Sequence, residues 1–217
     1  MNEEFFERLR ERVLPYFDDV GSHEFSHTKR VHDMAIKISE GEKVDIDVVR
    51  VAALLHDIAR GKQDRGEVDC HADAGAKIAR NILKEMDFPE DKINSVTYSI
   101  EVHRHSKGIT PNTKEALIIQ DADRLDALGA ITIGRMFASG EKKGKQLHNP
   151  DINSEIWKGK DYSGVSSKTT IDAFYNKILK IRPENFNTQK AREIAKSRYD
   201  YVYDFVERFK KEWVGKL

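Results

Sequence analysis

The chain has 217 residues, which is enough for one sizeable hydrophobic core and favours one domain over two. Its 37 Lys and Arg residues balance 37 Asp and Glu residues, so no overall field favours a nucleic acid polymer or an anionic membrane as a partner. No apolar stretch is long enough to span a membrane, and the single cysteine, Cys70, excludes an intramolecular disulfide framework. We therefore expect a cytoplasmic globular protein.

Apolar residues recur at helical spacing along most of the chain, and no segment shows the sustained alternation that is typical of a strand. Ser26 is placed to cap the first clear helix and Gly41 to end it, Gly61 to end the second, and Thr188 to cap the last. The pattern predicts an all-α fold with helices over about 26–40, 45–59, 70–86, 90–106, 113–137, 168–181 and 188–213.

Residues 139–167 interrupt this pattern with many Gly, Lys, Asn and Ser residues and few apolar anchors. A connection of this length is unusual inside a compact domain. We interpret it as a lid, a substrate-facing loop or a merely solvated loop.

Several polar side chains lie within the apolar stripe of their own helix rather than on its polar face. One imidazole on such a stripe is more often a satisfied core residue than a ligand. An ionised carboxylate, however, loses much hydration energy on burial unless it is paired or binds a metal. We therefore expect a shared polar centre formed by His27, His56, Asp57, His71, His103 and Asp123.

The residue types of this centre suit a metal ion. Imidazole and carboxylate together bind divalent transition metals such as Mn, Co, Ni, Fe or Zn. Two histidines and two aspartates leave coordination positions open on an octahedral ion, which indicates chemistry more than a structural role.

The order of His27, the doublet His56-Asp57, and Asp123 resembles the H…HD…D signature of the HD-domain superfamily of metal-dependent phosphohydrolases. The contexts HTKRVHDMA, AALLHDIARGK and QDADRLDALG resemble the corresponding segments, with Asp123 at the ligand position rather than Asp121 or Asp126. The segment CHADAGAKIARNIL and the one ending IEVHRH resemble intermediate helices that carry second-metal ligands in some members. The tail is similar to a small bacterial branch, so the resemblance covers most of residues 20–213.

This resemblance implies a single compact helical bundle over residues 1–217, with an HD core at about 20–138, the long loop at about 139–167 and added C-terminal helices at about 168–213. It implies a metal held by His27, His56, Asp57 and Asp123. His71 and His103 are candidates for a second metal or for supporting the first, and His103 is also a candidate proton donor. Because some relatives in the branch resemble nucleotide pyrophosphohydrolases, the expected substrate is a nucleotide or another small phosphorylated compound.

Arg60 departs from the pattern, because certain nucleotidase members place an acid there, so the general acid or base does not carry over. Positive side chains near the expected ligands are candidates for binding phosphate. They are Arg60, Lys62, Arg104, Lys107 and Arg124.

Two alternatives stay open from the sequence. Some superfamily members with extra histidine ligands hold two irons and act as oxygenases, and the histidines at 71 and 103 are compatible with that class. A non-catalytic module that senses a nucleotide through its metal is the other alternative, although such a module does not need the complete signature.

Overall fold

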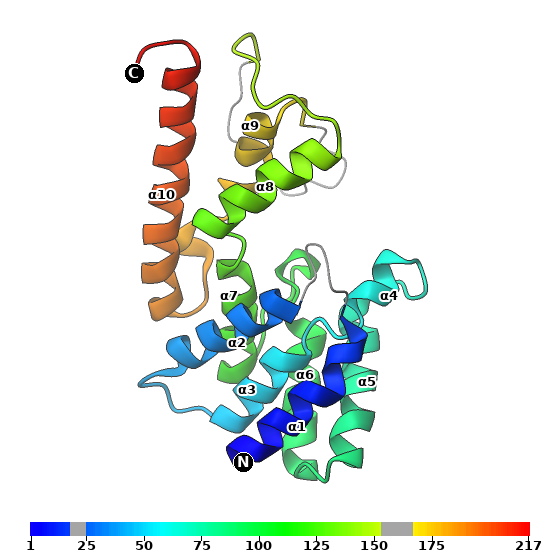
Figure 1. Cartoon of the computed structure of the whole chain (residues 1–217). Helices are drawn as coiled ribbons and strands as arrows, with labels where there is room; N and C mark the ends of the chain where they lie inside the picture. Colours follow the sequence, from blue (N-terminus) through cyan, green and yellow to red (C-terminus); the bar gives the residue numbers. More distant parts are fainter. Residues whose placement is uncertain (18–24, 153–166) are drawn as a thin grey trace. The chain divides into compact units, whose positions relative to one another are not determined.

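The computed structural model describes residues 1–17, 25–152 and 167–217, and in these ranges the chain is helical and contains no strand, which confirms the all-α prediction (Figure 1). The α-helices are α1 (Glu3–Val13), α2 (Phe25–Ser39), α3 (Ile46–Leu55), α4 (Arg60–Asp64), α5 (His71–Glu85), α6 (Glu90–Val102), α7 (Lys114–Leu125), α8 (Ala130–Lys142), α9 (Thr170–Ala173) and α10 (Gln189–Trp213). The chain forms two compact units, Met1–Arg124 and Leu125–Leu217. The assignment of the whole chain to one domain stays a prediction.

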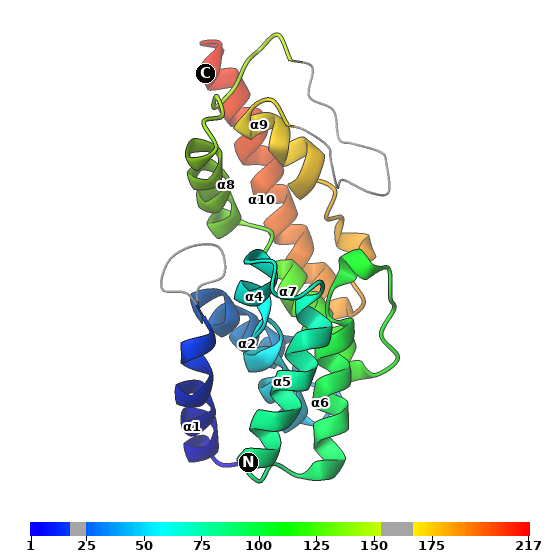
Figure 2. The same cartoon turned by 90° about the vertical axis from the view of Figure 1, so that its right-hand side faces the viewer.

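Helix α3 is the centre of the first unit. It packs against α1, α2, α5 and α6, and its valines, alanines and leucines are buried all round. The Asp45 carboxylate caps its start by accepting from the main-chain N–H groups of Asp47 and Val48. Helices α5 and α6 run side by side against it (Figure 2). Because α3 is enclosed, the polar residues that follow it, His56 and Asp57, lie in the interior of the unit.

Several helices end or begin at other residues than the sequence pattern predicts. Helix α3 ends at Leu55 and α6 at Val102, each about one turn earlier than expected, and a histidine follows each as its C-cap. Gly61 does not end a helix, because it lies inside the short helix α4. Ser26 is inside α2 rather than its cap, whereas Gly41 does end that helix with a positive φ of 84°.

The predicted helix over 113–137 is wrong, because two helices, α7 and α8, occupy this region. Gly129 separates them with a φ of 91°, a conformation that residues with a side chain rarely adopt. The main-chain carbonyls at this break accept hydrogen bonds from side chains instead of from the next helical turn. The Thr132 hydroxyl donates to Asp126 O, and Arg198 donates to Leu125 O. A helical break that depends on such partners is not visible in the apolar periodicity.

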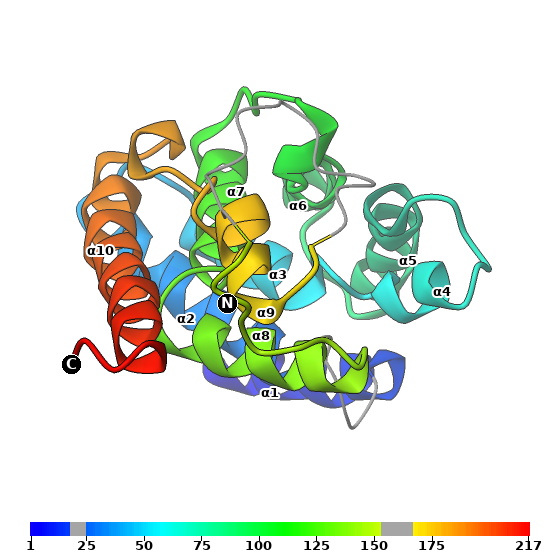
Figure 3. The same ribbon diagram turned by 90° about the horizontal axis from the view of Figure 1, so that it is seen from above.

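The second unit is built on α10, which Thr188 caps as predicted. Helix α8 packs against both α10 and α9 (Figure 3). The predicted helix over 168–181 is shorter than expected, because α9 passes into a π-helical turn over Phe174–Ile178. An aromatic cluster joins these elements through Phe137, Phe174, Phe205 and Phe209. Helix α8 also extends into the predicted loop to Lys142, and residues 153–166 of that loop lie outside the described residues.

Substitution by alanine should have opposite effects on stability at two glycines of α8. A Cβ at Gly140 would clash with the buried Thr170 hydroxyl, whereas a Cβ at exposed Gly134 meets nothing within 4 Å. We expect Gly140→Ala to lower the free energy of unfolding by about 1–3 kcal/mol through overpacking. Gly134→Ala should raise it by about 0.5–1 kcal/mol through helix propensity. Urea unfolding of both variants checks this, and equal effects would contradict it.

Candidate metal centre

All six inward-facing polar side chains predicted from the sequence come together in the first unit, Met1–Arg124. They come from α2, the end of α3, the start of α5, the end of α6 and α7. Helix α7 is fixed beside the end of α6, because the Gln120 amide donates to Val102 O at 3.1 Å. Five elements that are distant in sequence therefore converge on one point.

One half of this centre contains the four residues of the H…HD…D pattern. His27 Nε2 lies 3.3 Å from His56 Nε2, 3.4 Å from Asp123 Oδ1 and 3.8 Å from Asp57 Oδ2. His56 Nε2 lies 3.9 Å from each of the two carboxylate oxygens. Neighbouring ligands of one transition-metal ion, each at about 2.0–2.2 Å, are separated by distances of this size.

The other half contains His71 and His103. Asp57 Oδ1 lies 3.1 Å from His71 Nε2 and 3.6 Å from His103 Nε2, and the two ring nitrogens lie 3.3 Å apart. Asp57 therefore turns one carboxylate oxygen to each half. The three side chains form a second group whose donor atoms could hold an ion.

The helix ends orient two of these rings. His56 Nδ1 donates to Ala53 O at 2.8 Å, and His103 Nδ1 donates to Ile100 O at 2.6 Å. Both histidines are helix C-caps, where the last carbonyls have no partner inside the helix. A proton on Nδ1 leaves the lone pair of Nε2 directed at the centre, which is the form of imidazole that binds a metal.

The charges of the centre also suit a cation. Burial alone would raise the pKa of Asp57, but the surrounding imidazoles of His56, His103 and His71 lower that pKa well below its ordinary value. Burial lowers the pKa of His56 and of His71, against the opposing effect of Asp57. At His103, burial acts in the same direction, but its contact with Asp57 outweighs burial and raises the pKa. An ionised carboxylate thus faces imidazoles of which two are held neutral.

The centre is enclosed except at one ligand. The side chains of His56 and His71 are 0% and 2% exposed, and that of Asp57 is 11% exposed. The Asp123 side chain is 29% exposed. Solvent therefore reaches the centre on the side of Asp123.

The five candidate phosphate-binding cations differ in their surroundings. Lys107 pairs with Asp73 at 2.7 Å, and Arg104 donates to the thiol of half-buried Cys70 at 3.8 Å. Arg60 reaches the centre itself, because its Nη1 lies 3.4 Å from His71 Nδ1. Lys62 and Arg124 are half-buried, the latter beside the ligand candidate on α7.

One residue that sequence reasoning missed is Gln63 on α4. Its side-chain oxygen contacts the main-chain N–H of His71 at 3.1 Å and also contacts Nδ1 of the same residue. The sequence carries little signal for it, because a glutamine in a short charged segment is typical of a solvated surface.

The carboxylate of Asp123 lies 3.4 Å from His27 Nε2 and 3.9 Å from His56 Nε2. The nearby Asp126 instead pairs with Arg135 at 3.0 Å in the second unit, and Asp121 is buried. The assignment of Asp123 to the ligand position stays a prediction.

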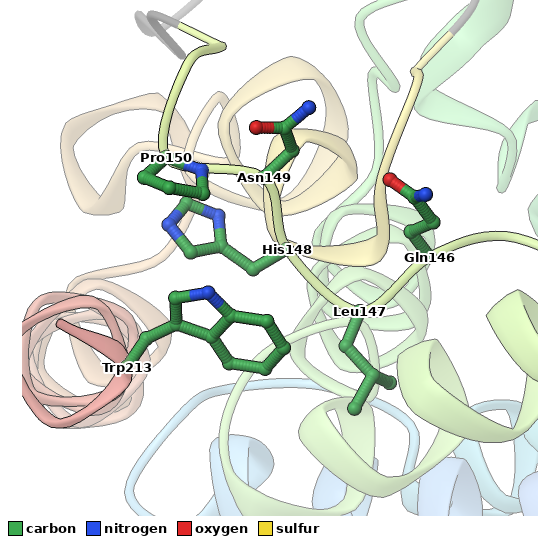
Figure 4. Close-up of a pocket in the computed structure, with 6 residues that line it drawn as sticks. All are labelled: Gln146, Leu147, His148, Asn149, Pro150 and Trp213. Carbon is green, nitrogen blue, oxygen red and sulfur yellow. The ribbon is translucent and has the colours of Figure 1, made fainter.

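A separate pocket of about 430 Å³ lies in the second unit (Figure 4). Among the residues that the structure describes, its lining offers one imidazole and no carboxylate. Its lining residues are Gln146, Leu147, His148, Asn149, Pro150 and Trp213.

Comparison with known proteins agrees with this geometry. The HD domain family model matches residues 25–128, a range that includes all six residues of the centre. The chain is 30% identical to the uncharacterised protein YpgQ of Bacillus subtilis over 91% of this chain and 88% of YpgQ. The chain therefore belongs to the HD-domain superfamily.

Solved structures share the fold over nearly the whole chain. An HD-superfamily hydrolase from Bacillus thuringiensis has a TM-score of 0.75 and 32% identity, with 98% of each chain covered. The crystal structure of Bacillus subtilis YpgQ in complex with ADP has a TM-score of 0.70 and 24% identity, with 97% of this chain and 99% of that chain covered. In the described part of the chain, no helix is both long and apolar enough to cross a membrane.

Removal of single ligands should separate the two halves of the centre. We expect Asp57→Ala to abolish binding of divalent metal in both halves, because each half uses one of its oxygens. Asp123→Ala should weaken only the first half, and His71→Ala only the second. Isothermal titration with Mn²⁺ or Co²⁺ measures this, with circular dichroism to verify folding. Unchanged metal content in folded Asp57→Ala would refute the assignment.

Proposed function

We propose that the protein is a divalent-metal-dependent phosphohydrolase that acts on a nucleotide or another small phosphoester or pyrophosphate. The observation that carries this proposal is the Asp57 carboxylate, whose Oδ2 faces His27 and His56 while its Oδ1 faces His71 and His103. A purely structural metal site is usually closed by its protein ligands. This centre opens to solvent at Asp123, where a substrate can approach.

In this proposal, His27, His56, Asp57 and Asp123 hold one ion, and Asp57, His71 and His103 hold a second. Mn, Co, Ni, Fe and Zn all suit such a mixed set of nitrogen and oxygen donors. When bound, such ions supply Lewis acidity, which polarises a phosphoryl oxygen and lowers the pKa of a water molecule. The ionised carboxylate of Asp57 and the neutral imidazoles of His56 and His71 are in the protonation states that ligation requires, whereas contact with Asp57 raises the pKa of His103, which would have to give up its Nε2 proton to a bound ion.

Hydrolysis forms a bond from the water oxygen to phosphorus and breaks the bond from phosphorus to the leaving oxygen, which takes up a proton. The side chains of Arg60, Lys62 and Arg124 are the cations with which this chain would hold and neutralise the phosphate. Lys107 and Arg60 each also pair with an exposed carboxylate, that of Asp73 at 2.7 Å and that of Asp64 at 3.4 Å respectively. His103 donates its Nδ1 proton to Ile100 O and presents Nε2 to Asp57 and His71, which supports a role as ligand, while its raised pKa supports a role as proton donor.

The nucleotide is supported by the relative YpgQ, of which a crystal structure in complex with ADP is known. A nucleotide combines the phosphates that a metal centre attracts with a base that pocket walls can select. The zero net charge of this chain agrees with a small substrate rather than a polymer, because polymer binding relies on an extended basic surface.

The second half of the centre also favours one other candidate function. Four imidazoles and a shared carboxylate suit a pair of iron ions, as in the oxygenases of the superfamily. Two irons per chain with oxygen-dependent turnover would favour that function over hydrolysis. Tight binding of nucleotide without turnover in any metal would instead favour a sensing module.

A screen of nucleotides and simple phosphoesters, repeated with Mn, Co, Ni, Mg and Zn, tests the proposed hydrolysis. We expect metal-dependent release of phosphate or pyrophosphate that a chelator stops and that Asp57→Ala abolishes. Product analysis identifies the bond that is cleaved. Equal turnover by Asp57→Ala would show that the activity does not come from this centre.

Arg60→Ala tests the role of the cation nearest the centre. A hydrogen bond to a charged group contributes about 1.5–3 kcal/mol, so we expect kcat/KM to fall about 10- to 100-fold. Arg12→Ala is the matched control, because Arg12 pairs with Glu85 on an exposed surface of the same unit. Metal content is measured alongside, since Arg60 also contacts His71. Equal kinetics of the two variants would exclude Arg60 from phosphate binding.

A further inference from the structure

His71 differs from the other helix-end histidines of the centre in its place on its helix. His56 and His103 end their helices, and each donates its Nδ1 proton to a carbonyl of the last turn. His71 begins α5, and the groups without partners at a helix start are N–H donors, not carbonyls. The residue before it, Cys70, makes no side-chain capping hydrogen bond. The acceptor for the His71 ring must therefore come from another element.

Gln63 of α4 supplies this acceptor. One atom of its amide contacts both the main-chain N–H and Nδ1 of His71. A main-chain N–H can only donate, so the amide atom must be the oxygen. An amide oxygen can only accept, so His71 Nδ1 must carry a proton. The lone pair of Nε2 is then directed at Asp57 Oδ1, 3.1 Å away, and is available to a metal.

Arg60 competes for the same ring nitrogen. Its Nη1 lies 3.4 Å from His71 Nδ1, and a guanidinium group only donates hydrogen bonds. A hydrogen bond from Arg60 would require Nδ1 without its proton, so the neutral ring would carry the proton on Nε2 and could not bind a metal there. Gln63 prevents this because it makes the closer contact to Nδ1 and is held in place by the main chain.

We infer that Gln63 is a positioning residue that selects the metal-binding tautomer of His71 and so makes the second half of the centre competent to bind an ion. This inference rests on the proposed metal-dependent function. It goes beyond that function by naming the side chain that decides between one bound metal and two.

Substitutions at Gln63 test the inference through metal binding rather than turnover. Calorimetric titration with Mn²⁺ should give two ions per wild-type chain. Gln63→Leu removes the acceptor, and we expect affinity for the second ion to fall about 10- to 100-fold, as for other residues that orient metal ligands. Affinity for the first ion should be unchanged. Gln63→Glu keeps an acceptor and should restore the second ion. Arg65→Ala, an exposed change at the end of the same short helix, is the control.

A spectroscopic measurement separates tautomer selection from a general structural role. Two Mn²⁺ ions that share a carboxylate give a spin-coupled resonance spectrum, whereas one ion gives an isolated spectrum. We expect the coupled signal in wild type and Gln63→Glu and only the isolated signal in Gln63→Leu, with equal thermal unfolding of the metal-free variants. A coupled signal of wild-type strength in Gln63→Leu would overturn the inference.

The outcomes also distinguish this inference from the proposed function. A wild-type chain that hydrolyses phosphoesters with a single bound ion would overturn the role of Gln63 and leave hydrolysis standing. The converse result is that the wild-type chain binds two ions and Gln63→Leu loses the second, while no phosphorylated compound is turned over. That result would refute hydrolysis and leave the role of Gln63 standing.

Discussion

The first unit depends on one buried carboxylate. Asp57 lies just beyond the end of the buried helix α3, and its side chain is only 11% exposed. An ionised carboxylate in such a place is costly unless charged or hydrogen-bonding partners surround it. Four imidazoles from other positions of the chain provide this environment. His56, His71 and His103 each lie at an end of a helix, whereas His27 lies in the first turn of α2. The packing of α2, α5 and α6 around α3 is therefore also the assembly of the site.

Helix ends orient two imidazole rings of the site. A helix C-terminus leaves carbonyls without partners, and a histidine at the C-cap satisfies one of them with its Nδ1 proton. This occurs at His56 and at His103, so a single contact both ends the helix and presents Nε2 to the centre. It also explains why α3 and α6 are shorter than their apolar patterns predict. The pattern continues through the histidine, but the helix does not.

The sequence identified the fold and the members of the centre better than it identified helix ends. Burial of a side chain on an apolar stripe follows from local periodicity, and this was sufficient to select His27 and Asp123 although they lie far apart in the sequence. The break at Gly129 and the contact of Gln63 depend on groups that only tertiary structure brings near. Periodicity contains no information about such partners, which is why the long predicted helix over 113–137 was wrong.

The unequal exposure of the ligand candidates has a kinetic consequence. Ligand exchange at a metal begins where water or a competing chelator can replace a protein donor, and Asp123, 29% exposed, is the accessible donor of the first half. His71 and His103 are each 2% exposed, so a second ion has no comparable route. An ion beside Asp123 would equilibrate readily with the surrounding metal pool, whereas its neighbour would exchange slowly. The metal available during folding would then determine the slowly exchanging ion beside His71 and His103. The metal available while the protein works would determine the ion beside Asp123.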